Sequence, residues 1–409
     1  MAKILILIGA HICTAPRPQK EAEALANAGH DVTVAGFWSD PELVKRDRLF
    51  MKNKKWRFEP IIDFQPHQKI NNLFVRLRSR LAREKFQKLG IFSPSLLGYG
   101  ARAMLRYALQ QKADLTIVHS ESGLWVGCQL LDRGYQVGVD FEDWFSEDLL
   151  PEACASRPIK QLKSLENRLI NECTYCLTTS HAMAEAMAKA YNSKPPTVIY
   201  NTFPLEDRLQ LDGKICDRQN LNIPSIHWFS QTIGEGRGLE ILFQSLQYIK
   251  KPIEIHLRGN YSEKARQWLE LQISPEWHDH LFIHSTVPNY ELLSRIAEHD
   301  IGLALEIPYC HNKQFTISNK FFQYLQAGLA LIATDTDGQS EILSKHSEIG
   351  ELISNNNAIA LAEAVNSLAN NVQKLAFAKK SALIIAERKL NWEKQENIIS
   401  QLVQTAINK

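Results

Sequence analysis

The sequence predicts an α/β protein made of two doubly wound domains with parallel sheets. Apolar strands alternate with helical segments along most of the chain, and this alternation is interrupted once, between residues 202 and 224. The apolar runs, of which KILILIG at 3–9 is the first, are continuous, as expected of strands buried on both faces. We therefore expect two strand–helix arrays that face each other across a cleft between the carboxyl ends of their strands.

The first array contains six predicted strands. Pro16 and Pro18 interrupt the chain before the first helix, Gly29 ends that helix, and Ser180 is the expected N-cap of another. The strands are KILILIG, DVTVAGF, LTIVHS, YQVGVDF, YCLTTS and TVIYN, and the helices lie at 19–27, 96–111, 124–131, 159–171 and 181–190.

The second array follows a polar connection without a clear period, residues 202–224. Its first helix carries Leu239, Leu242, Phe243 and Leu246 at i, i+3, i+4 and i+7, which is one apolar stripe. Residues 358–409 are predicted to be helical throughout. The strands of this array are IHWFS, IEIHLRG, LFIHS, DIGLALE and LALIATD.

Composition excludes several classes of protein. With 44% hydrophobic and 22% charged residues and a net charge of +2, the chain resembles ordinary globular proteins and is not expected to bind nucleic acid. It shows no signal-peptide pattern and no apolar run long enough for a membrane span, so we expect a cytoplasmic protein. Its one CxxC, Cys173 and Cys176, has no second pair to complete a zinc site, which favours structural thiols.

Positive charge is concentrated in one segment. Residues 44–90 hold 14 Lys/Arg and 4 Asp/Glu, so the rest of the chain is acidic. Within this segment LFVRLRSRLAREKFQKLGIF, residues 73–92, mixes leucines with arginines as a basic amphipathic helix does. Such a helix lies on an anionic membrane surface, or else it is a solvated charged face over the domain core.

Two segments of the second array contain residues suited to phosphate. A loop with Gly234, Gly236 and Gly238 runs from a strand into a helix, and its Arg237 suits a phosphate group; a flexible turn with a solvated arginine is the alternative. The spacing matches neither a dinucleotide fingerprint nor a Walker loop.

The second segment is the helix ISNKFFQYLQAG. It places Lys320 and Gln323 three residues apart on one face near its N-terminus, beside Asn319. Gln323 has a donor and an acceptor, which suits ribose hydroxyls.

These landmarks together resemble the group 1 retaining glycosyltransferases, which are family 4-like and have the GT-B fold. The resemblance spans nearly the whole chain. It is carried by RPQKEAEALANAGHDVTV, IYNTF, the glycine loop at 231–238, LRGN at 257–260, VPNYELL at 287–293, SNKFFQYLQAG at 318–328, TDTDGQSEIL at 334–343 and LNWEKQ at 390–395. It implies two Rossmann-like domains, 1–205 and 206–390, facing a central cleft. A C-terminal helix, 391–409, would cross back to the N-terminal domain.

The resemblance also implies a donor site on the second domain. Arg237 and Lys320 would bind the diphosphate, while Gln323 stands where the family usually has a ribose-binding glutamate. A second departure is Phe315, which replaces the first of the family's two glutamates, so that Glu306 is the nearest acid. The remaining expected donor-binding residues are Gln231, Gly236, Gly259, Val287 and Asn319.

The first domain is expected to supply the acceptor side. Asp140, Glu142 and Asp143 lie at the carboxyl end of a strand, where acids serve either chemistry or helix capping. The family often has a histidine near Glu142 that this chain lacks. His119 and Glu121 are further candidates for the cleft.

We therefore expect a hexosyltransferase-like enzyme of cell-envelope or polysaccharide biosynthesis. It would move a sugar from a nucleoside diphosphate sugar to a glycan or lipid-linked acceptor, with retention. The nucleotide sugar is a substrate, and no other cofactor and no essential metal are expected. The proposed catalytic residues are Arg237, Lys320, Glu142 and Asp143. The alternatives are a nucleotide-sugar-binding scaffold with weak or no turnover, and a sugar-nucleotide epimerase.

Overall fold

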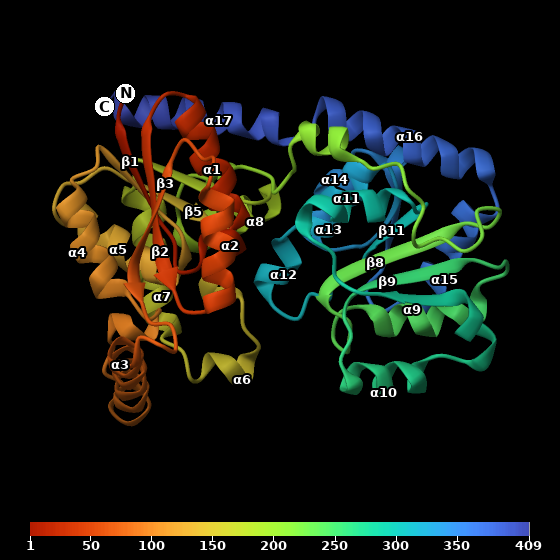
Figure 1. Cartoon of the computed structure of the whole chain (residues 1–409), viewed down its shortest axis with the longest axis horizontal. Helices are drawn as coiled ribbons and strands as arrows, with labels where there is room; N and C mark the ends of the chain where they lie inside the picture. Colours follow the sequence, from red (N-terminus) through yellow and green to blue (C-terminus); the bar gives the residue numbers. More distant parts are fainter. Residues whose placement is uncertain (409) are drawn as a thin grey trace. The chain divides into compact units, whose positions relative to one another are not determined.

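The computed structural model describes residues 1–408, which form two compact units (Figure 1). Unit 1 comprises Met1–Ile199 together with the chain from Gln395 onward, and unit 2 comprises Tyr200–Lys394. Each unit contains one parallel sheet flanked by helices, which is the GT-B fold implied by the resemblance. The last helix, α17 (Trp392–Ile407), lies largely within unit 1 although it follows unit 2 in the chain.

Unit 1 has a seven-stranded sheet of order β3-β2-β1-β4-β5-β6-β7. The order changes direction between β1 and β4, and the carboxyl ends of strands beside such a switch point are where doubly wound sheets bind ligands. The strands are β1 (Lys3–Leu7), β2 (Asp31–Trp38), β3 (Arg57–Asp63), β4 (Leu115–Val118), β5 (Val137–Phe141), β6 (Tyr175–Thr178) and β7 (Thr197–Val198). The helices are α1 (Pro16–Asn27), α2 (Pro41–Met51), α3 (Lys69–Leu89), α4 (Ala101–Gln111), α5 (Ser120–Leu131), α6 (Pro151–Cys154), α7 (Ile159–Glu172) and α8 (His181–Tyr191).

Unit 2 has a six-stranded sheet of order β10-β9-β8-β11-β12-β13, which changes direction between β8 and β11. The strands are β8 (Ser225–Thr232), β9 (Glu254–Asn260), β10 (Leu281–His284), β11 (Ile301–Ala304), β12 (Ala330–Thr334) and β13 (Gly350–Ile353). The helices are α9 (Leu239–Ser245), α10 (Glu263–Gln272), α11 (Asn289–Ala297), α12 (His311–Phe315), α13 (Asn319–Ala327), α14 (Asp337–Leu343), α15 (Ala358–Ala369) and α16 (Val372–Arg388).

The fully apolar runs form the buried centres of both sheets. β4, β5, β11 and β12 are buried at every residue, which explains why they lack the polar alternation of half-exposed strands. Ser180 caps α8 as predicted, since its hydroxyl accepts the Met183 N–H at 3.0 Å. Gly328 ends α13 in the left-handed conformation (φ +80°), which glycine adopts without strain.

Some elements differ from the sequence prediction. Pro16 begins α1 instead of interrupting the chain before it, because proline is well tolerated in a first helical turn. The connection at 202–224 contains a 3-10 helix, Leu205–Gln210. The edge strands β3 and β13 were not predicted: they are partly exposed and lack an apolar run, and β3 contains Pro60.

Two further features bear on expected properties. None of the helices in residues 1–408 is both long and apolar enough to cross a bilayer. All seven cysteines in this part of the chain are free thiols, Cys173 and Cys176 among them.

Candidate functional site

The glycine loop after β8 has a backbone shape that favours glycine. Gly236 and Gly238 have φ values of +74° and +80°, in the left-handed region. A Cβ on Gly238 would lie 2.6 Å from the carbonyl oxygen of Leu305, so the loop packs closely against the chain after β11. The Gly236 N–H donates to the carboxylate of Glu240. The Gly236 N–H, which was expected to bind an anionic ligand, therefore already donates to Glu240 of the same chain.

Arg237 is exposed in this loop, and Gln231, in the last part of β8, is exposed as well. Its Nη1 donates to the Ser230 hydroxyl of β8 at 3.1 Å. A guanidinium group has five N–H donors in a planar fork, so a single hydrogen bond leaves most of them for a phosphate.

Lys320 lies in the first turn of α13. Its Nζ donates to Oε1 of Glu306 at 3.1 Å and lies 5.8 Å from the ring centroid of Trp228. Trp228 and Ser230 both belong to β8, so Lys320 and Arg237 contact side chains that are two residues apart on one strand. The structure therefore brings both predicted cations to the same strand, β8.

Glu306 is the carboxylate that pairs with Lys320, and its surroundings favour the ionised form. Burial opposes its ionisation, but the charge of Lys320 and the hydrogen bond from Ser318 prevail, and they lower the pKa of Glu306. Glu306 also lines a small cavity of about 140 Å³ at the carboxyl ends of β11 and β12, together with Gly238, Thr334 and Asn355. The cavity joins the glycine loop to the Lys320–Glu306 pair.

The other predicted donor-binding residues lie around the same edge of the sheet. Asn319 is exposed at the start of α13. Gln323 is half-buried one turn later, and its amide has no hydrogen-bonding partner within residues 1–408. Gly259 is buried at the end of β9, where a Cβ would lie 2.7 Å from the Ser230 carbonyl oxygen. Val287 is partly buried before α11.

In unit 1 the ends of β4 and β5 hold a buried network of charges. Asp140 on β5 accepts two hydrogen bonds from Arg17 of α1, at 2.6 and 3.0 Å, and both side chains are almost fully buried. Arg17 also donates to the backbone carbonyl of Ile199 at 2.6 Å. Asp140 thus fixes α1 against the sheet, and it does not cap a helix.

His119, directly after β4, lies between two carboxylates. Its Nδ1 is 2.6 Å from Glu142 and its Nε2 is 2.9 Å from Glu21. Burial opposes the charged ring, but the two carboxylates outweigh burial and raise the pKa of His119 to about 10. At neutral pH His119 is therefore an imidazolium that donates from both nitrogens, which makes it a positioning cation and not a general base.

Glu142 is the member of this network that reaches solvent. Its side chain is 31% exposed, whereas those of His119 and Glu21 are buried. Asp143 follows in the bend after β5 and is half-buried. Glu121 on α5 forms an ion pair with Arg157, so its charge is already matched.

The same network has the residue types of a metal site. Glu21, His119 and Asp140 offer ligand atoms within 4.8 Å of one another. However, Arg17 occupies both oxygens of Asp140, and His119 is held as a cation by its two carboxylates. The imidazolium of His119 would have to lose a proton to bind a metal, and the charge of Arg17 beside Asp140 opposes a second cation, so these contacts fit an ion-pair network better.

Arg17 and Glu21 were not assigned from the sequence. They lie four residues apart on α1, which places them on one helix face. Charged residues at this spacing are common on exposed helices, so the sequence alone does not distinguish a buried pair. Their burial becomes evident only when α1 is packed beside Asp140 and His119.

Two family models match the sequence of this chain. The family model described as Glycosyltransferase Family 4 matches residues 20–207, and the model described as Glycosyl transferases group 1 matches residues 224–371. No curated protein matches the chain by sequence.

Solved structures with the same fold are numerous. Sucrose-phosphate synthase from Thermosynechococcus elongatus has a TM-score of 0.72 at 15% identity, with 100% of each chain covered. Anabaena HepE in complex with UDP and glucose has a TM-score of 0.67 at 16% identity, covering 99% of this chain and 100% of that one. A UDP-N-acetylglucosamine 2-epimerase, itself assigned only provisionally, from Listeria monocytogenes has a TM-score of 0.57 at 11% identity, covering 99% and 96%. At these identities the similarity shows the fold alone.

Proposed function

Since the chain belongs to the group 1, family 4 glycosyltransferases, we propose that it transfers a hexose from a nucleoside diphosphate sugar to a glycan or lipid-linked acceptor, with retention at the anomeric carbon. The reaction would belong to cell-envelope or polysaccharide biosynthesis. UDP and UDP-glucose occupy the HepE structures of the same fold, so UDP-glucose is the first donor to test.

The observation that supports this proposal is the convergence on β8. Arg237 and Lys320 contact Ser230 and Trp228 of that strand, beside the cavity at the ends of β11 and β12. The departing nucleoside diphosphate gains negative charge as the bond to the sugar breaks. Fixed cations that meet this charge stabilise the transition state more than the ground state, and this difference accelerates the reaction.

Further side chains of unit 2 suit the rest of the donor. Gln323 has an unpartnered amide one turn beyond Lys320, and we assign it to the ribose hydroxyls. We assign Gly259, at the carboxyl end of β9, and Val287, which follows β10, to the nucleotide base of the donor. On the acceptor side we assign Glu142 and Asp143, of which Glu142 is oriented by His119.

The first test removes each cation. We expect Arg237→Ala and Lys320→Ala each to lower the rate of sugar transfer by about a hundredfold or more, the usual range for a lost transition-state donor. The measurement is release of UDP from UDP-glucose, with binding of the donor followed by thermal shift. Turnover like that of the original protein in both variants would reject the assignment.

A scaffold protein without turnover is the second candidate. It is favoured by the ion pair that already neutralises Lys320 and by the uncharged Gln323 in place of the family's glutamate. A donor that raises the melting temperature but is neither hydrolysed nor transferred, across a panel of nucleotide sugars, would support this reading.

A further inference from the structure

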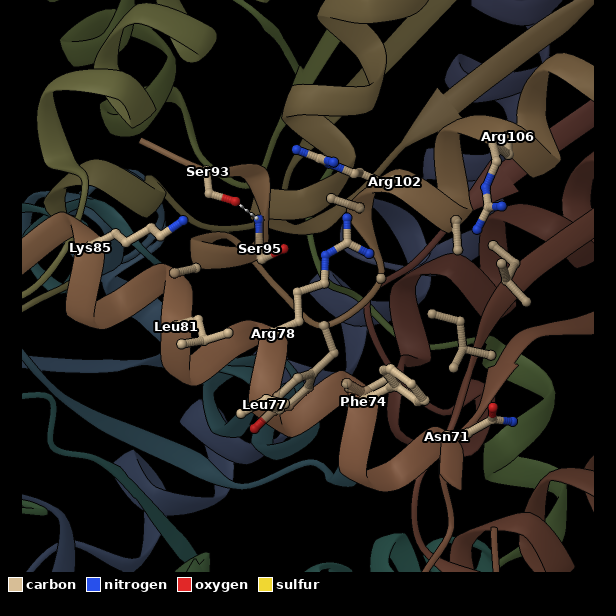
Figure 2. Close-up of a pocket in the computed structure, with 18 of the residues that line it drawn as sticks. Asn71, Phe74, Leu77, Arg78, Leu81, Lys85, Ser93, Ser95, Arg102 and Arg106 are labelled. Atoms are coloured by element: carbon tan, nitrogen blue, oxygen red, sulfur yellow. Dashed lines mark hydrogen bonds between the residues drawn. The ribbon is translucent and has the colours of Figure 1, made fainter. Parts of the chain in front are cut away.

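Unit 1 contains a pocket that is lined by none of the candidate site residues described above. It has a volume of about 880 Å³ and lies between α3 and the segment that leads into α4 (Figure 2). This volume is within the range of pockets that hold small organic ligands. The walls come from α3, from the end of β3 and from residues 91–106.

The helix that forms one wall exposes its apolar side chains. Leu73 and Phe74 are 66% and 67% exposed, and Leu77 and Leu81 are nearly half exposed. The buried residues of α3 are instead Ser79 and Ala82. This exposure counts against the interpretation of α3 as a charged face over the domain core, because most of its large apolar residues do not face the core. They line the pocket or are open to solvent.

The pocket is also strongly positive. Arg78 and Lys85 of α3 and Arg102 and Arg106 of α4 line it, as Figure 2 shows. Within residues 1–408 none of these four side chains forms an ion pair or a hydrogen bond. One carboxylate lines the same pocket, Asp63, and it accepts hydrogen bonds from the Gln65 side chain at 3.0 Å.

Three of these cations repel one another. Partial burial and the nearby charges of Arg102 and Arg106 lower the pKa of Arg78. Other arginines among the described residues meet carboxylates, as Arg80 meets Glu84 at 3.1 Å on the same helix. Uncompensated arginines around an apolar hollow form a site that an anion would stabilise.

We propose that this pocket binds a lipid phosphate, with the phosphate or pyrophosphate group on Arg78, Arg102 and Arg106 and the first part of the hydrocarbon chain against Phe74, Leu77 and Leu81. The charges suit an anion, and the exposed apolar side chains beside them suit a hydrocarbon chain. The proposal rests on the proposed function in one respect only, namely that this lipid is the acceptor or its carrier.

The test is direct binding with four probes. Decyl phosphate below its micelle concentration presents both features, inorganic phosphate presents only the charge, and decyl maltoside presents only the chain. Anionic vesicles present lipid phosphates only as part of a bilayer surface, and not as single dissolved molecules. Isothermal titration calorimetry should give decyl phosphate at least about tenfold tighter binding than either single-feature probe, as expected when charge-assisted hydrogen bonds add to apolar burial.

Two matched triple variants localise the binding. The pocket variant is Arg78→Gln/Arg102→Gln/Arg106→Gln, and the control is Arg76→Gln/Arg80→Gln/Arg83→Gln, which removes the same charge from residues of α3 that do not line the pocket. We expect the pocket variant to bind decyl phosphate at least about tenfold more weakly, because charged hydrogen bonds are lost, and the control to bind it as before. The substituted side chains are mostly exposed, and retained circular dichroism would exclude misfolding.

Two outcomes would overturn the proposal. One is equal loss of decyl phosphate affinity in both triple variants, which would indicate a diffuse surface effect. The other is decyl maltoside binding as tightly as decyl phosphate. Neither outcome depends on turnover, and Arg237→Ala should retain decyl phosphate binding, so failure here is distinguishable from failure of the proposed transferase activity.

Discussion

The Lys320–Glu306 pair decides how substitutions at the candidate donor site should be interpreted. Both side chains are about four-fifths buried, and each partly compensates the other's charge. Removing the lysine alone takes away the proposed phosphate contact, and it also leaves Glu306 beside the cavity without its cation. A loss of activity in Lys320→Ala therefore has two physical causes, and a second substitution is needed to separate them.

We expect Lys320→Met to lower the free energy of unfolding by about 2 kcal/mol, in line with a charged partner left unpaired in a partly buried site. The double variant Lys320→Met/Glu306→Gln should recover most of that stability, because no charge remains uncompensated. Its transfer activity should stay as low as that of the single variant. Urea unfolding and UDP release measure the two effects, and recovery of activity in the double variant would show that Lys320 acts only through Glu306.

Among the helices, α3 exposes most of its large apolar side chains, and its buried residues are the small Ser79 and Ala82. Its apolar residues are exposed and its basic residues are numerous, so we propose that it binds an anionic membrane surface through residues 73–92. Residues 73–92 also include lining residues of the pocket, but the charges tested here, Arg76, Arg80 and Arg83, do not line it.

Flotation with vesicles tests this surface. We expect the original protein to float with vesicles that contain anionic lipid and to lose at least about tenfold in affinity when Arg76, Arg80 and Arg83 become Glu, because each basic residue near such a surface contributes about 1 kcal/mol. Vesicles of neutral lipid are the control. Flotation that is unchanged by the charge reversal would remove the membrane surface from the proposal.

The elements also show how far the sequence was informative. Runs such as LTIVHS and DIGLALE predicted the central strands because burial on both faces leaves an uninterrupted apolar signal. The edge strands β3 and β13 gave no such signal, since an edge strand is partly solvated. Because Asp140 and Glu142 lie at the end of a predicted strand, the sequence indicated that they belong to one site. Arg17 and Glu21 of the same network lie on α1, more than a hundred residues earlier in the chain. Contacts between distant segments leave no local pattern.

At the scale of the whole molecule, the two units carry buried histidines with opposite pKa shifts. In unit 2, burial is the main cause that lowers the pKa values of four clustered histidines, that of His256 to about 3. The others are His227, His284 and His299. Asp217, Glu254 and Arg258 face the same cluster. In unit 1, His119 has a raised pKa of about 10.

The sign of the pH dependence follows from these shifts. Below the ordinary histidine pKa of 6.5, unfolded unit 2 binds more protons than folded unit 2, so its stability should fall as the pH drops from about 6.5 toward 3. The contribution of His119 is present below 6.5 and should be lost as the pH rises toward about 10. Unit 2 should thus be the more sensitive to acid.

Calorimetric unfolding between pH 4 and 8 measures this effect. His256→Asn should reduce the loss of stability in acid, whereas His278→Asn, at an exposed position, should leave it unchanged. An identical pH profile for His256→Asn and the original protein would show that the cluster does not govern acid sensitivity.

The return of α17 to unit 1 has a consequence for biosynthesis. Ile399, Val403 and Ala406 are buried in that helix, yet the ribosome makes them after all of unit 2. The first half of the nascent chain must therefore wait, with an apolar face uncovered, while some two hundred further residues emerge. Unit 2, which is continuous in the chain, is free to fold in the meantime, so the part synthesised first is the part completed last.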